Sequence, residues 1–228
     1  IWPDQPMGVD VAGSIETVKA TSRQDLIKYL NRQYTSSNAV LVVSGNLDHE
    51  KVIIESEKAF EGFREGNPMK FSPSSFYTDK PLTVLDKMET NQSHLTIAFK
   101  NFSLVDDLRH ASLVLSVLLG GGMTSRLFEQ VREKRGLAYS VNATSQGYSD
   151  CGIFYIDAGI APENTEETFK VIIEEIKKVK NDLSKDEVES SKELIRGRMM
   201  MRYEDSRAIA MNYGIQHLLN NRIISIEE

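Results

Sequence analysis

The hydrophobic pattern of the first 60 residues predicts a helix, a strand and a second helix. Apolar side chains recur at helical spacing up to Tyr34, behind a capping-box pattern formed by Thr21 and Gln24. Residues 39–43 are a continuous, mostly β-branched apolar run, which is typical of a strand buried on both faces. Asp48 can cap the helix that follows. Because a buried strand must pair its backbone groups, residues 39–43 need a partner strand elsewhere.

Residues 61–80 interrupt this periodicity with a high density of Gly, Pro and Ser. Such a composition is typical of turns and linkers rather than of packed elements. We therefore place a domain boundary there. We expect one domain over residues 1–66 and a second domain over residues 71–228.

The chain beyond residue 80 predicts an antiparallel sheet accompanied by helices. Apolar positions alternate in short stretches joined by tight turns, and the longer helical stretches are kept apart from them. Strands that pair with their neighbours while helices segregate indicate an α+β fold, with the helices packed on one face of the sheet. The expected strands are 82–88, 93–101, 138–146 and 152–160, and the expected helices are 106–119, 124–136, a stretch after Pro162, and a stretch from a Ser184–Glu187 capping box to about Asn221.

Composition narrows the class of protein. The 228 residues carry 33 acidic and 27 basic side chains, a formal net charge of −6, which argues against a protein that grips phosphate backbones. No apolar run approaches the roughly 18–20 residues needed to cross a bilayer, and no signal peptide is visible. The single cysteine excludes an internal disulfide and a cysteine-cluster zinc site. We expect a cytoplasmic protein without a nucleic-acid or membrane partner.

The histidines do not form a metal-binding pattern. None of the four lies three to five residues from another, and His49-Glu50 is followed at position 53 by Ile rather than by the His of an H-E-x-x-H motif. A zinc enzyme needs three protein ligands for its metal. We therefore expect no zinc site built wholly from this chain.

One short stretch is unusually basic for an acidic protein, with Arg126, Arg132, Lys134 and Arg135 lying within ten residues. A short basic helix between a glycine run and a strand can present side chains to a cleft. Arg132 can donate a forked pair of hydrogen bonds to a carbonyl or a carboxylate. Tyr139 can offer its phenolic O–H where negative charge develops.

Ordinary structural roles are an alternative for the same residues. Arg132 can form an ion pair with Glu129 or Glu133, and Tyr139 can simply pack. Spacing alone favours this interpretation, since surface ion pairs are common. The glycine run at 120–122 follows a helix and lacks a phosphate-loop pattern, so helix termination is its ordinary role.

Residues 119–141, LGGGMTSRLFEQVREKRGLAYSV, resemble the pitrilysin/insulinase family of zinc peptidases. The resemblance is greatest to bacterial members related to the mitochondrial processing peptidase. Residues from about 71 onward resemble most of the second, non-zinc domain of that family. The stretches that resemble the end of its zinc-binding domain are residues 2–8, 21–34 and 38–46.

The resemblance implies a clamshell of two homologous α+β domains that encloses peptide substrates. Its zinc is held by an H-x-x-E-H motif and a downstream glutamate, all at positions that would precede Ile1. The chain also opens without a methionine, so we expect it to be part of a longer protein whose zinc it does not itself bind. By the family pattern, Arg132 and Tyr139 are the catalytic pair that holds the substrate carbonyl and steadies the oxyanion formed when zinc-bound water attacks. The residues that we assign to substrate binding are Gly120, Gly121, Gly122 and Arg126.

Three functions remain open from the sequence, and a plain protein-interaction module is one of them. The chain is part of a zinc metalloendopeptidase that hydrolyses peptides in an enclosed chamber, or it is a non-catalytic partner or scaffold subunit of the same family. Its expected partners are a peptide substrate and either the missing zinc-binding domain or a partner subunit, with a homodimer as a further arrangement. We also hypothesise that residues 1–60 dock on the sheet of residues 71–228, within one chain or swapped between two, so that residues 39–43 gain a partner strand.

Overall fold

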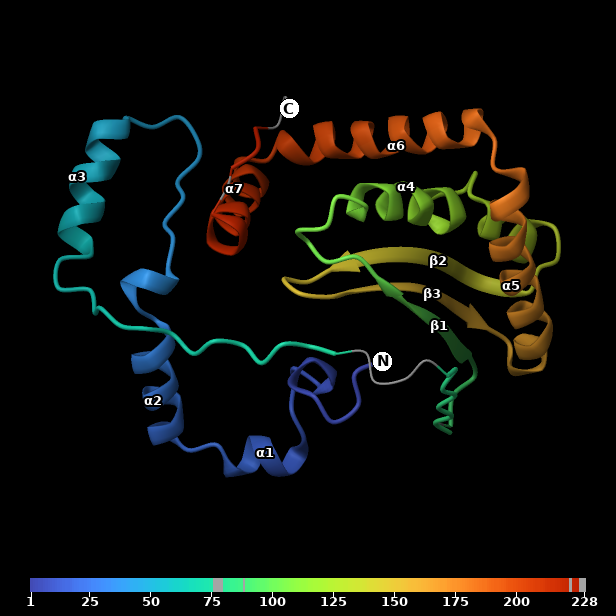
Figure 1. Ribbon diagram of the computed structural model, residues 1–228, viewed down its shortest axis with the longest axis horizontal. Helices are drawn as coiled ribbons and strands as arrows, with labels where there is room; N and C mark the ends of the chain where they lie inside the picture. Colours follow the sequence, from blue (N-terminus) through green and yellow to red (C-terminus); the bar gives the residue numbers. More distant parts are fainter. Residues whose placement is uncertain (76–79, 88, 222, 226–228) are drawn as a thin grey trace. The chain divides into compact units, whose positions relative to one another are not determined.

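The computed structural model describes residues 1–75, 80–87, 89–221 and 223–225 of the chain (Figure 1). Packing divides the chain into two units, each built from two separate stretches of sequence. The division into residues 1–66 and 71–228 follows the sequence rather than the packing, and it stays a prediction. The sheet unit comprises Ile1–Gly8 and Ser74–Arg198, and the helical unit comprises Val9–Pro73 and Met199–Glu228.

Three antiparallel strands in the order β1-β3-β2 organise the sheet unit (Figure 1). β2 and β3 form a hairpin, whose turn is closed by a 2.7 Å hydrogen bond from the Tyr148 amide to the Cys151 carbonyl. β1 pairs with the other edge of β3 in continuous register, starting with Ser93 opposite Ile160. The strands are β1 (Ser93–Asn101), β2 (Ala138–Gly147) and β3 (Gly152–Ile160).

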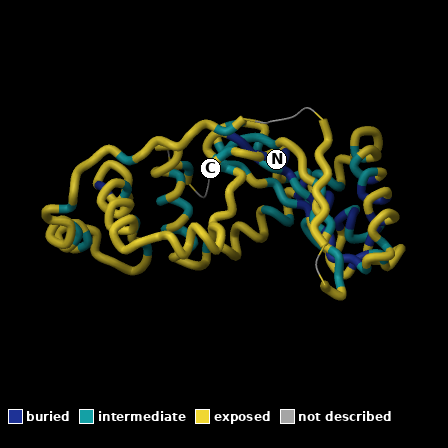
Figure 2. Tube along the Cα trace, turned by 90° about the horizontal axis from the view of Figure 1, so that it is seen from below, coloured by how far each residue is buried: buried dark blue, intermediate teal, exposed yellow. Residues whose placement is uncertain are grey.

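Helices cover one face of this sheet. Alternate residues of β3 (Phe154, Ile156 and Ala158) are buried, and they join Leu119 and Ile172 from the helices in one apolar core. Figure 2 shows that the buried residues gather in the sheet unit. The predicted α+β fold is therefore confirmed. The helical elements of this unit are η1 (Pro6–Gly8), α4 (Arg109–Gly120), the π-helix η3 (Phe128–Glu133), η4 (Pro162–Asn164), α5 (Thr165–Asp182) and most of α6 (Lys185–Tyr203).

The first eight residues are anchored to the sheet unit. Trp2 is buried, and its ring meets that of Tyr148 edge to face with 6.2 Å between the ring centroids. Gln5 Nε2 donates a hydrogen bond to the Ser75 carbonyl at 2.7 Å, and Gln5 Oε1 accepts one from the Ser75 amide at 2.8 Å. These contacts join the start of the chain to a segment 70 residues further on.

The helical unit has few buried side chains. Among its described residues, Thr35 is the one that is buried. Gly214 lies beside Val42, since a Cβ on this glycine would be 3.3 Å from Val42 Cγ2. No described helix of either unit combines the length and the apolar character that a bilayer-spanning helix needs. The helices of this unit are α1 (Ile15–Ala20), α2 (Arg23–Gln33), η2 (Ser36–Asn38), α3 (His49–Ala59) and α7 (Ser206–Asn220).

Residues 39–43 form no strand, which corrects the prediction from their apolar pattern. Val40, Leu41 and Val43 in this run are 37–54% exposed. An apolar β-branched run suits a strand, but it becomes one only where a second backbone lies beside it. No other described residue of the helical unit forms a strand beside this run. The hypothesis that residues 1–60 dock on the sheet, within one chain or swapped between two, stays a prediction.

The strand predicted at residues 82–88 is likewise not formed over the described part of that range. Residues 82–87 have no regular secondary structure, and residue 88 lies outside the described residues. The expected partner of this segment, residues 93–101, does form strand β1, which in the described sheet pairs with β3.

Helix starts follow the capping side chains. Asp48 caps α3 and Ser184 caps α6, as the sequence predicts. The capping box predicted at Thr21 is wrong by one residue, because Ser22 is the N-cap of α2. Thr21 instead ends the short helix α1, which the apolar pattern did not reveal.

Candidate functional site

Arg132 lies in a π-helical segment rather than in an ordinary α-helix. The Lys134 amide donates to the Glu129 carbonyl at 2.9 Å, a bond between residues five apart. Leu127 and Val131 are completely buried, so the core side of this segment is fixed. Arg132 is exposed. π-helical turns are rare and are frequently found at functional sites.

A tight turn leads from η3 into β2. Gly136 has φ +61°, a conformation that favours glycine. Its amide donates to the Arg132 carbonyl at 3.1 Å, and the Leu137 amide donates to the Val131 carbonyl at 2.9 Å. In the usual glycine-terminated helix end, the corresponding amides bond carbonyls three and five residues back. Here they bond carbonyls four and six residues back. Asn164 Nδ2 also donates to the Leu137 carbonyl at 3.3 Å, which supports the turn from the start of α5.

Tyr139 is the extra residue of a β-bulge. Ala138 lies opposite Ile160 and Ser140 lies opposite Gly159, so the register leaves Tyr139 without a facing residue on β3. A bulge reorients a side chain, and bulges are common beside active sites. Tyr139 is 65% exposed. The turn therefore brings Arg132 and Tyr139 to the surface from its two sides.

The structure distinguishes Arg132 from the other cations of its segment. Lys134 Nζ pairs with Glu129 at 2.7 Å, and Arg135 donates to the carbonyl and side-chain oxygens of a neighbouring glutamine. The guanidinium of Arg132 lies over the ring of Phe128, with 4.8 Å from Cζ to the ring centroid. No acceptor among the described residues takes up its N–H groups, so neither alternative ion pair of Arg132 is formed.

Arg126 is bound by two carboxylates. Its Nε and Nη2 donate to the two oxygens of Glu187 at 2.6 and 2.8 Å, and its Nη1 donates to Asp182 at 2.6 Å. The hydrogen bonds from Arg126 lower the pKa of Glu187 to about 2, against the opposite effect of partial burial. The same bonds raise the pKa of Arg126. The geometry gives Arg126 a bracing role between the residues ahead of η3 and the α5–α6 junction, and its part in substrate binding stays a prediction.

Close packing explains two glycines of the run at the end of α4. A Cβ on Gly120 would lie 2.3 Å from the Ala143 amide nitrogen, and one on Gly121 would lie 2.5 Å from Val117 Cα. The Gly121 amide donates to the Val117 carbonyl at 2.8 Å and closes the helix. Close approach thus accounts for Gly120 and Gly121, whereas a Cβ on Gly122 would meet Leu194 Cδ2 at 3.4 Å, an ordinary contact. Substrate contacts by Gly120, Gly121 and Gly122 stay a prediction.

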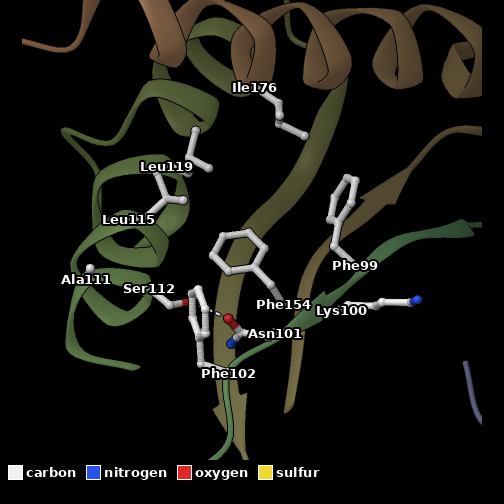
Figure 3. A pocket seen from close by; sticks show the side chains of 10 residues that line it. All are labelled: Phe99, Lys100, Asn101, Phe102, Ala111, Ser112, Leu115, Leu119, Phe154 and Ile176. Atoms are coloured by element: carbon white, nitrogen blue, oxygen red, sulfur yellow. Dashed lines mark hydrogen bonds between the residues drawn. The ribbon is translucent and has the colours of Figure 1, made fainter. Parts of the chain in front are cut away.

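An apolar pocket of about 340 Å³, which the sequence did not indicate, lies between the sheet and helices α4 and α5 (Figure 3). Asn101, which lines this pocket, lies at one end of the sheet, and Tyr139 lies at the other end. Ser112 Oγ donates to Asn101 Oδ1 at 2.7 Å, Asn101 Nδ2 donates to Ser145 Oγ at 2.9 Å, and the two hydroxyls lie 2.9 Å apart. The side chains of Ser112, Asn101 and Ser145 thus hydrogen-bond to one another. The remaining lining residues are Phe99, Lys100, Phe102, Ala111, Leu115, Leu119, Phe154 and Ile176.

The described residues do not fit the zinc that the resemblance implies. No group of three or more His, Cys, Asp or Glu side chains in this part of the chain is placed to hold a metal ion. A zinc enzyme requires three such ligands.

Known proteins of similar sequence are named zinc proteases. The chain is 30% identical over 229 residues to an uncharacterized zinc protease of Rickettsia bellii and, over the same length, to the uncharacterized zinc protease YmxG of Bacillus subtilis. Each alignment covers 100% of this chain and 55% of the relative. The chain therefore spans about half the length of these relatives.

Solved structures share the fold. A chain of complex III2 from Candida albicans, bound to Inz-5, has a TM-score of 0.87 at 20% identity, covering 99% of this chain and 56% of that one. The peptidase M16 inactive domain from Pseudomonas fluorescens has a TM-score of 0.84 at 20% identity, covering 97% and 53%. Residues 20–195 match the family model described as the peptidase M16 inactive domain. The zinc-peptidase resemblance is confirmed: the chain belongs to the peptidase M16 family, and most of it matches the inactive domain of that family.

Proposed function

We propose that this chain is the substrate-holding half of a zinc-dependent endopeptidase that cleaves peptides in an enclosed chamber. In this proposal, Arg132 and Tyr139 bind the carbonyl oxygen of the scissile peptide bond. One observation carries the proposal. Among the four cations of its segment, Arg132 is the one whose N–H groups have no acceptor in the described part of the chain. The zinc-protease names of the relatives support the reaction class.

The two side chains suit a carbonyl that is turning into an oxyanion. A guanidinium offers parallel N–H donors and a permanent positive charge, and a phenol adds an O–H donor. Donors fixed in advance stabilise the negative charge that develops on the carbonyl oxygen during attack by water. Each donor is held by an irregular stretch of backbone. Arg132 lies in a π-helix, and Tyr139 lies in a β-bulge. Both irregularities direct side chains away from the regular helix or sheet positions.

The metal is expected from outside the described residues. Because the groups described here do not fit zinc, the proposal requires a zinc-binding segment of a longer polypeptide or a separate zinc-binding subunit. This chain then contributes binding and charge stabilisation, while the ligands of the metal come from its counterpart.

The test uses the peptidase assembled from this chain and its zinc-binding counterpart, with an internally quenched peptide as substrate. Arg132→Ala and Tyr139→Phe should each lower kcat/KM by about 10²-fold, the usual cost of removing one oxyanion donor. Arg135→Ala is the matched control, because Arg135 is an exposed cation of the same segment that is bonded to a protein acceptor. We expect this control to change kcat/KM less than twofold. Equal activity of the Arg132→Ala and Arg135→Ala proteins would show that the assignment is wrong.

A second candidate function is that of a non-catalytic partner or scaffold subunit. It is favoured by the fold that the chain shares with a component of the Candida albicans complex III2. This candidate predicts that the assembled protein binds its partner but hydrolyses no peptide, with or without added zinc. Hydrolysis that a chelator abolishes and zinc restores would instead support the peptidase.

A further inference from the structure

The guanidinium of Arg132 lies over the ring of Phe128. The distance of 4.8 Å from Arg132 Cζ to the ring centroid lies within the range of an attractive cation–π contact. The two residues stand four positions apart in the π-helix η3. The N–H groups of Arg132 have no acceptor among the described residues. The ring of Phe128 is therefore the partner that this part of the chain gives to the guanidinium.

The apolar core does not account for Phe128. Its neighbours Leu127 and Val131 belong to the core of the sheet unit and are completely buried. Phe128 is only half-buried, and it is neither a member of that core nor one of the partly buried residues that pack against it. A large aromatic ring at this position therefore needs another explanation than core filling.

Stacking gives the guanidinium an orientation without consuming its donors. Arg132 Cζ lies over the ring, and a cation–π contact of this kind needs no hydrogen-bond acceptor, so the five N–H groups remain available to a ligand. An ion pair with a carboxylate would hold Arg132 equally well, but it would occupy those donors. The ring thus restricts a long, flexible side chain and leaves its hydrogen bonds for a ligand.

We propose that Phe128 is a positioning residue for Arg132, and this inference rests on the proposed function of Arg132. The ring holds the guanidinium in the orientation in which its N–H groups meet the substrate carbonyl. Phe128 acts through Arg132 and does not itself touch the reacting atoms.

Activity measurements on the assembled peptidase give the first test. Phe128→Leu should lower kcat about tenfold with little change in KM, and Phe128→Tyr, which keeps an aromatic face, should retain kcat within about threefold. In the Arg132→Ala background, Phe128→Leu should cause no further loss. Melting temperatures of all variants control for unfolding. An unchanged kcat in Phe128→Leu, or an undiminished additional loss in the Arg132→Ala background, would overturn the proposal.

A chemical probe reads the contact on the chain itself, without activity. Phenylglyoxal modification followed by peptide mapping measures the reactivity of Arg132, with Arg135 as an internal control in the same protein. Phe128→Leu should raise the modification rate of Arg132 several-fold and leave that of Arg135 unchanged. Equal Arg132 rates in the two proteins would overturn the positioning role.

The two measurements separate the possible failures. If Arg132→Ala is impaired but Phe128→Leu is not, the positioning role of Phe128 is wrong and the proposed function stands. If Arg132→Ala keeps full activity, the proposed function is wrong, and the role of Phe128 falls with it even where the modification rates show the ring contact.

Discussion

At the end of α4, one hydrogen atom in place of a methyl group decides how closely the helix approaches β2. A Cβ on Gly120 would lie 2.3 Å from the Ala143 amide nitrogen and 2.7 Å from the Asn142 carbonyl carbon. Both of these atoms belong to backbone, which cannot swing aside as the tip of a flexible side chain can. In a close-packed interior, a methyl group at this point must push the helix away from the strand.

We predict that Gly120→Ala destabilises the sheet unit by about 1–3 kcal/mol, the usual cost of overpacking. The measurement is urea denaturation followed by tryptophan fluorescence. Gly197→Ala is the matched control, because Gly197 lies inside α6 with open space at its Cβ position. Replacing this glycine should stabilise the protein by about 0.5–1 kcal/mol. A Gly120→Ala protein as stable as the wild type would contradict the packing argument.

The partners of single cations show why the site was only partly predictable. The family resemblance points to Arg132 and Tyr139, whereas spacing alone favours an ion pair between Arg132 and Glu129 or Glu133. The fold gives that glutamate to Lys134 instead. Arg126 finds its partner 61 residues away, across a distance that no local pattern reports. Whether the N–H groups of Arg132 find an acceptor is thus decided by the folded unit and not by the nearby sequence.

Elements that were predicted correctly draw their signal from nearby sequence. β2 and β3 follow each other through a short turn, and their predicted bounds agree with the structure to within one residue. Caps at Asp48 and Ser184 are local as well. Residues 39–43 fail because a strand depends on a partner that composition does not reveal. The π-helix and the bulge that flank Gly136 were also missed, since each inserts a single residue without changing the apolar pattern.

The pair of Arg126 and Glu187 connects two elements and makes their contact dependent on pH. The pKa of Glu187 is about 2 in the folded protein, lowered from 4.5 mainly by its hydrogen bonds from Arg126. A lowered folded pKa means that the unfolded chain takes up the proton first. The stabilisation is therefore complete above about pH 4.5 and is lost as the pH falls toward 2. Because a third of the Glu187 side chain is exposed, we expect about 1–2 kcal/mol rather than the full value of the shift.

Glu187→Gln should lower the free energy of unfolding by this amount at pH 7 and flatten its decline between pH 5 and pH 2. Urea denaturation at several pH values measures both effects. Glu189→Gln is the control, since Glu189 pairs with Lys192 at the exposed surface of the same helix. The control should change stability by less than about 0.5 kcal/mol. The same acid dependence in wild type and Glu187→Gln would refute the role of this pair.

Across the whole molecule, buried side chains are distributed unevenly between the two units. The apolar core consists of residues of the sheet unit, whereas Thr35 is the buried residue of the helical unit within the described ranges. Stability follows the apolar surface removed from water. Regions with few buried contacts open at lower free energy than packed cores. The helical unit should therefore unfold before the sheet unit rather than together with it.

The single tryptophan of the chain allows this order to be measured. Trp2 is buried against Tyr148 in the sheet unit, so its fluorescence follows that unit, while far-ultraviolet circular dichroism follows the helices of both units. In urea, we predict a midpoint by circular dichroism that lies below the midpoint by fluorescence. Hydrogen exchange should likewise be faster in α2 and α3 than in β3. Coincident transitions by the two probes would mean one cooperative unit, and the argument from burial would then be wrong.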